Sequence, residues 1–173
     1  MHTALTLLPA LEAARSAAPD LLRTPVWNSM AVRYEHPFVD RLWTPFEFEG
    51  QSFRLSLHHI HPCELGQAFW HPHPWPSIVL LLRGKYEMGV GYGAGTSPPD
   101  SVLTCILEPG AIYEMVNPDA WHYVRPLDPQ GSWSIMLSGE PWGRQMPGPK
   151  PPSAVELWSE QISRMLDEFS SLL

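Results

Sequence analysis

Short extended segments, separated by turn residues, follow one another from Ser52 to Leu137. Residues 52–61 show this best, because apolar and polar side chains alternate there with the period of two that is typical of a β-strand. Gly84 marks a tight hairpin between two later segments. Further strands are expected at residues 71–73, 78–82, 86–90, 102–107, 111–116, 121–124 and 132–137. This series of short strands predicts a mainly β fold, either a sandwich or a barrel.

The two ends of the chain predict helices instead. Residues 4–18 are rich in alanine and leucine and predict a helix, with Pro9 in its first turn or splitting it. Ser153 and Glu156 match a capping box that would begin a second, amphipathic helix. Its apolar face must be buried, either against the barrel or against a partner subunit in a homodimer. The predicted parts of this single domain are a helix and loop-rich arm (1–50), a barrel (51–140), a proline-rich linker (141–152) and a C-terminal helix (153–173).

Composition narrows the class of protein. Of the 173 residues 44% are hydrophobic and 17% are charged, which is typical of a globular protein. The formal net charge of -7 argues against nucleic acid as a partner. No apolar run approaches the ~20 residues that span a bilayer, and a cleaved signal is not indicated, so a cytoplasmic protein with no membrane contact is expected. Cys63 and Cys105 are expected to be free thiols.

A pair of histidines lies just before the apolar run of residues 78–82, which is predicted to be a buried strand. His71 and His73 are two residues apart, and Pro72 and Pro74 hold the backbone extended. Side chains at this spacing point to the same face of a strand, so both imidazoles can converge on one point. Five of the eight histidines lie between positions 58 and 73. This crowding indicates half of a metal site, which His122 could complete.

The spacing of these residues resembles the two motifs of the cupin superfamily. The first motif is matched, in order, by Gly66, His71, His73, Ser77 and Gly84, where Ser77 takes the place of the family's usual glutamate. The second motif is similar to the series Gly110, Pro118, Ala120 and His122. The resemblance implies a double-stranded β-helix, or jelly-roll, barrel that binds one divalent metal ion.

Carried over residue by residue, the resemblance implies that the ligands are His71, His73 and His122. The missing glutamate leaves a three-histidine site, similar to those of cysteine dioxygenase and the diketone-cleaving dioxygenases of the same superfamily. Three neutral imidazoles leave the full charge on the ion, which favours an anionic, chelating small-molecule substrate. Fe(II) is the favoured ion, and Zn, Mn or Ni are alternatives.

Other residues could enlarge or replace this set. Glu87 or Glu114, on neighbouring strands, could supply the missing carboxylate. His59 and His61 form another pair at the same spacing, on the face that Phe53, Leu55 and Leu57 suggest is the barrel interior, with Arg54, Ser56 and His58 on the other face. This pair could be ligands in place of the first pair or could line the pocket. Trp75 could line the mouth of the site, with Ser77 beside it. The plainest alternative is that the histidines are hydrogen-bonded core or rim residues without a metal.

The leading functional hypothesis is a small-molecule oxygenase of the thiol or diketone dioxygenase type. An isomerase or lyase that uses the metal as a Lewis acid is the nearest alternative. A non-catalytic cupin that binds a small molecule is a hypothesis of a different class.

Overall fold

The computed structural model describes residues 7–24, 27–33, 37–100, 102–143 and 153–173. Two antiparallel sheets and two α-helices make up most of this part of the chain. The elements are α1 (Leu8–Leu21), β1 (Asn28–Arg33), β2 (Pro37–Phe48), β3 (Gln51–Ile60), the 3-10 turn η1 (Leu65–Gln67), β4 (His71–Pro72), β5 (Ser77–Arg83), β6 (Tyr86–Tyr92), β7 (Val102–Leu107), β8 (Ile112–Met115), β9 (Ala120–Pro126), β10 (Ser132–Ser138), β11 (Ser153–Val155) and α2 (Ser159–Leu172). The predicted mainly β fold with a helix near each end is confirmed.

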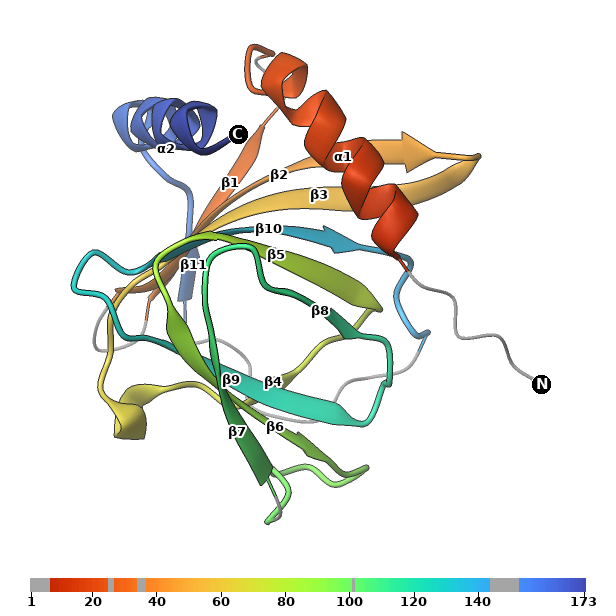
Figure 1. Cartoon of the computed structure of the whole chain (residues 1–173), viewed down its shortest axis with the longest axis vertical. Helices are drawn as coiled ribbons and strands as arrows, with labels where there is room; N and C mark the ends of the chain where they lie inside the picture. The colour runs from red at the N-terminus through yellow and green to blue at the C-terminus, as the bar shows by residue number, and fades with distance from the viewer. Residues whose placement is uncertain (1–6, 25–26, 34–36, 101, 144–152) are drawn as a thin grey trace.

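The molecule has three layers, which Figure 1 shows from the side. The larger sheet has seven strands in the order β11-β1-β2-β3-β10-β5-β8, and the smaller has the order β4-β9-β6-β7. The two helices cover one face of the larger sheet, and the smaller sheet lies on its other side. The facing antiparallel sheets give the two-sheet arrangement expected of a jelly-roll barrel.

The larger sheet is buried on both faces, so the core has two parts. The part beneath the helices includes Leu11, Leu42, Leu57, Ile135 and Phe169. The part between the sheets includes Val39, Ile60, Leu81, Tyr86 and Val124. Because successive side chains point to opposite faces, neighbouring residues of one strand enter different halves of the core. This explains the continuous apolar run in β5.

The N-terminal region is more regular than predicted. Helix α1 has Pro9 in its first turn, as expected, but β1 and β2 occupy most of the segment predicted to be a loop-rich arm. The proline at position 45 concealed β2, since proline weakens a strand prediction. Pro45 lies beyond Trp43, where the pairing with β1 ends, so β2 has only one neighbouring strand there.

The C-terminal helix begins later than the predicted capping box. Residues 153–155 form β11, which pairs with β1, and α2 starts at Ser159. The backbone N–H of Trp158 donates to the side-chain oxygen of Gln161 at 3.0 Å, so these residues, not Ser153 and Glu156, cap the helix. Phe169 of α2 is fully buried and packs on the sheet, which confirms burial against the barrel. Residues 144–152 of the predicted linker lie outside the described residues.

Two smaller expectations concern membranes and thiols. Across the described part of the chain, no helix combines the length and apolar character needed to cross a membrane. Cys63 and Cys105 are free thiols, as predicted.

Candidate metal centre

Three histidines point ring nitrogens at one another in the space between the sheets. His71 on β4 lies directly opposite His122 on β9, and His73 is the first residue after β4. Nε2 of His122 is 3.2 Å from Nε2 of His71 and 2.9 Å from Nε2 of His73. We call these three residues the triad. The structure therefore brings together the side chains that the two motifs singled out.

Contacts of the outer ring nitrogens orient two of the rings. Nδ1 of His71 lies 3.0 Å from the carbonyl oxygen of Phe69, and because a carbonyl only accepts, this nitrogen carries the proton. Nδ1 of His73 lies 2.6 Å from Oγ of Ser77, which is fully buried. Nδ1 of His122 is buried and has no hydrogen-bond partner among the described residues. Nε2 of His71 thus presents a lone pair to the triad, as a metal-binding imidazole does.

Burial keeps the triad neutral at pH 7. It lowers the pKa of His71 to about 4, although the hydrogen bond to Phe69 opposes the shift. It also holds the pKa of His73 and of His122 well below the ordinary value, and the neighbouring imidazoles add to that effect. Neutral imidazole is the form that binds metal ions, so protons do not compete for the triad at pH 7.

The donor set fits one divalent ion. Three uncharged imidazole nitrogens that converge on one point suit Fe, Zn, Ni or Cu. Ser77, which stands where the cupin motif has glutamate, contacts the ring of His73 and is not part of the ligand-type cluster. Within the described ranges, that cluster contains no carboxylate. Such a set would leave the charge of a bound ion uncompensated by the protein.

The two glutamates considered as further ligands lie elsewhere. Glu87 on β6 accepts a hydrogen bond from the hydroxyl of Tyr123 at 2.8 Å and pairs with Arg125, on the outer face of the smaller sheet. Glu114 on β8 accepts a hydrogen bond from the backbone N–H of Leu7 at 2.7 Å, just before α1. Each glutamate precedes or follows an inward-facing residue by one position, and the alternation of the strand turns it away from the triad. The structure brings neither to the candidate centre.

His59 and His61 also face away from the triad. The ring of His59 stacks on Trp133 at 4.1 Å, and its Nε2 lies 3.0 Å from the carbonyl oxygen of Gln130. His61 lies 2.9 Å from the carboxylate of Asp40. The sequence placed this pair on the interior face of the barrel, but that face of β3 lies beneath the helices. The correction has a simple reason: an apolar alternation identifies a buried face, and here both faces are buried.

Asp40, His59 and His61 form a second cluster of ligand-type atoms. Asp40 also pairs with Arg33 at 3.0 Å. Burial would raise the pKa of Asp40, but the hydrogen bond with His61 and the charges of His61 and Arg33 outweigh burial and lower it. The two carboxylate oxygens of Asp40 contact Arg33 and His61, and Nε2 of His59 contacts the carbonyl oxygen of Gln130. These contacts indicate an internal ion-pair network.

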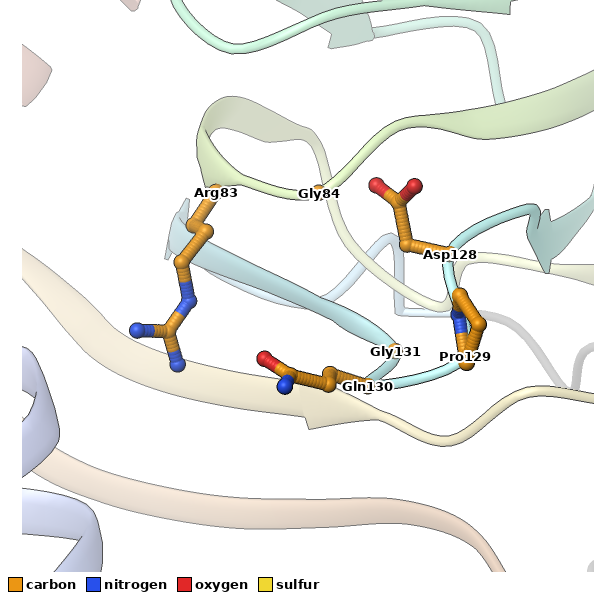
Figure 2. Close-up of a pocket in the computed structure, with 6 residues that line it drawn as sticks. All are labelled: Arg83, Gly84, Asp128, Pro129, Gln130 and Gly131. Carbon is orange, nitrogen blue, oxygen red and sulfur yellow. The ribbon is translucent and has the colours of Figure 1, made fainter.

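A pocket of about 310 Å³ lies near this second cluster, at the turns that join β5 to β6 and β9 to β10. Figure 2 shows Arg83 and Asp128 on opposite sides of it, with Gln130 between them. Its remaining lining residues are Gly84, Pro129 and Gly131. None of the triad lines it, so the pocket is separate from the candidate centre.

Two residues of the barrel interior were missed by the sequence analysis. Strand register pairs Arg41 on β2 with His58 on β3, on the face that also carries Val39 and Ile60 of the inner core. His58 is only 6% exposed, although the alternation in β3 placed it on the polar side. The crowding of histidines after position 58 was a signal for it. Nothing in the local sequence marks Arg41.

Trp75 lies in the loop between β4 and β5. The guanidinium of Arg54 lies 5.1 Å from the centre of the Trp75 ring. Nε1 of Trp75 is buried and has no hydrogen-bond partner among the described residues. Arg54 itself is exposed. This contact joins β3 to the loop that follows His73.

Comparison with known proteins finds similarity in fold only. No family model matches the chain, and no curated protein matches it significantly. A structure of Fe(II) HppE with substrate is 14% identical over 70% of this chain and 58% of that chain, with a TM-score of 0.47. The hydroxypropylphosphonic acid epoxidase from S. wedmorenis is 12% identical over 58% of this chain and 50% of its own, with a TM-score of 0.43. HEPD from Streptomyces albus, with Fe(II) and 2-hydroxyethylphosphonate, is 10% identical over 60% of this chain and 22% of its own, with a TM-score of 0.43. The chain spans about half the length of the HppE chains it matches.

Proposed function

We propose that the protein is a cupin-like, metal-dependent oxygenase of small molecules, with one divalent ion held by His71, His73 and His122. The observation that carries this proposal is the convergence of three neutral imidazoles. The Nε2 atoms of His71 and His73 both lie within 3.2 Å of Nε2 of His122. The hydrogen bond from Nδ1 of His71 to a carbonyl supports it, because it leaves Nε2 free for ligation.

Fe(II) is the first ion to test. Held by the three histidines, such an ion would supply Lewis acidity and could bind a chelating substrate and dioxygen. The chain itself would orient the centre through Ser77 and the carbonyl of Phe69. Buried Val79 and Leu81 line the interior of β5 and would exclude water. The absence of a carboxylate from the described cluster favours an anionic substrate.

Metal content tests the first half of the proposal. Protein purified without a histidine tag and reconstituted anaerobically with Fe(II) should bind one ion per chain. His73→Ala should lose that ion, whereas the matched change His61→Ala, in the second cluster, should retain it. Equal iron content in the two variants would contradict the assignment.

Oxygen consumption tests the second half. We expect iron-loaded protein to consume dioxygen with a member of a panel of thiols, diketones, phenols and hydroxyphosphonates. Binding of one iron without consumption with any of them would contradict an oxygenase and favour an isomerase, a lyase or a binding protein. The same iron form should give a nitric oxide complex with a characteristic electron paramagnetic resonance spectrum. That spectrum reports open coordination positions on the iron independently of turnover.

A further inference from the structure

The interior face of the larger sheet carries polar groups that lack partners. Nε of Arg41 and Nε2 of His58 are buried, and neither has a hydrogen-bond partner among the described residues. Oγ of Ser56, two residues before His58 on β3, is also buried and unpartnered. Buried polar groups in folded proteins are nearly always hydrogen-bonded, so several unpaired groups on one face require an explanation. A polar ligand between the sheets would provide one.

Arg41 faces the space between the sheets. It lies opposite His58 in the pairing of β2 with β3, on the same face as Val39 and Ile60, which belong to the core between the sheets. The side chain as a whole is half-buried, so part of it remains accessible although Nε is covered. Arg41 and the triad therefore lie on opposite sheets, and both face the space between them.

No counter-ion accompanies this charge in the described part of the chain. The ion pairs there join Arg23, Arg33, His61, Arg83 and Arg125 to carboxylates, and Arg41 has none. The charged group that does act on it is Arg54, a second guanidinium, which together with burial lowers the pKa of Arg41 to about 10. Within the described residues, neither guanidinium forms an ion pair with a carboxylate. A buried and unpaired charge is strongly destabilising unless a ligand compensates it.

We propose that Arg41 binds an anion in the space between the sheets, and that its ligand is the oxyanion end of a small organic acid whose other end reaches the triad. The inference rests on the proposed function for the role of the triad. A guanidinium binds a carboxylate or a phosphonate through two parallel hydrogen bonds, and burial strengthens that interaction. His58 and Ser56 offer further polar contacts on the same face.

Binding of simple oxyanions to the metal-free protein tests Arg41 apart from the metal. The probes are glycolate, a carboxylate, and methylphosphonate, a tetrahedral oxyanion, titrated calorimetrically at low ionic strength. Wild-type protein should bind at least one of them, and the stronger probe identifies the oxyanion geometry. Arg41→Met should weaken that binding about 10- to 100-fold, as expected for losing charge-assisted hydrogen bonds. Arg41→Lys, which keeps the charge but not the fork, should lie between the two.

Arg125→Met is the matched control. Arg125 is also half-buried, but it lies on the outer face of the smaller sheet and pairs with Glu87, so its loss should leave anion affinity unchanged. His73→Ala should lose the metal yet retain anion binding in the metal-free state. Failure of that variant to lose the metal would overturn the proposed function and leave the anion site standing.

Thermal stability gives a second, independent readout. In the absence of anions, Arg41→Met should melt about 2–4 °C above wild type, because it removes an uncompensated charge. A residue kept only for packing would lower the melting temperature instead. No anion binding by wild type, equal affinity in Arg41→Met, or a lower melting temperature of that folded variant would each overturn the inference.

Discussion

Ser77 is the residue on which the orientation of His73 depends. Its hydroxyl lies 2.6 Å from Nδ1 of His73 and is fully buried, so water cannot replace it. In metal sites, the hydrogen bond to the outer nitrogen of a ligating histidine fixes the ring and increases its basicity.

Ser77→Ala should therefore weaken metal binding about 10- to 100-fold without unfolding the protein. Competition with a chromogenic chelator measures the affinity, and circular dichroism checks the fold. Ser132→Ala is the control, because Ser132 is equally buried but lies opposite Ile60, where it contacts none of the triad. Equal affinities of the two variants would show that Ser77 does not orient His73.

Asp40 makes the stability of the folded protein depend on pH. Its carboxylate bonds to Arg33 and His61, and these contacts keep its pKa in the folded protein below the ordinary value near 4 despite burial. A carboxyl whose pKa is lowered by folding stabilises the protein above its unfolded-state pKa. That contribution is lost as the pH falls through the folded-state pKa.

Asp40→Asn should cost about 1–3 kcal/mol at pH 7, and the difference from wild type should shrink below pH 4. Urea denaturation at pH 7, 5, 4 and 3 measures it. Asp20→Asn, at an exposed carboxylate in α1, should follow the wild-type curve throughout. A constant difference at every pH would rule out the linkage.

At the scale of elements, the strands were predictable but their faces were not. The alternation in residues 52–61 correctly predicted β3, since strand periodicity is a local property of the sequence. Which face encloses the triad depends on where the helices dock, and that is a tertiary property. The face with Leu57 was therefore assigned to the barrel interior, while His58 and Arg41 were overlooked.

The same distinction applies to the C-terminal helix. Its apolar stripe was predictable, but its start was not, because pairing of β11 with β1 overrides the capping signal at Ser153. Phe169 shows how firmly α2 is docked, since its ring is fully buried and lies 5.3 Å from that of Trp133.

Phe169→Ala should destabilise the protein by about 3–5 kcal/mol, the usual cost of removing a buried aromatic ring. Urea denaturation followed by tryptophan fluorescence measures this. Ser170→Ala, next to it on the exposed side of the helix, should change stability by less than about 0.5 kcal/mol. A small effect of Phe169→Ala would mean that α2 leaves the sheet in solution.

Across the whole molecule, charge is divided between surface and interior. The chain carries a formal net charge of -7, yet the space between the sheets holds Arg41 and three neutral histidines without a described carboxylate in their cluster. A bound divalent ion would add to that positive potential. The two motifs predicted the triad because their spacing is a sequence property. Arg41 on the facing strand β2 was not predicted, because no motif includes it.

Metal binding should tighten one region of the molecule selectively. The triad joins the segment 69–77 to β9, so an ion held there would oppose any opening that separates them. At a free metal concentration of 100 times Kd, binding stabilises the closed form by about 2.7 kcal/mol. Amides of residues 69–77 that exchange through such opening should slow up to about 100-fold in hydrogen exchange measured by mass spectrometry.

Strand β1, which pairs with β2 and β11 far from the triad in sequence, should be unaffected, and His122→Ala should abolish the protection. Protection centred on residues 59–61 instead would place the ion in the second cluster, and uniform protection would mean that metal stabilises the whole fold without a local site.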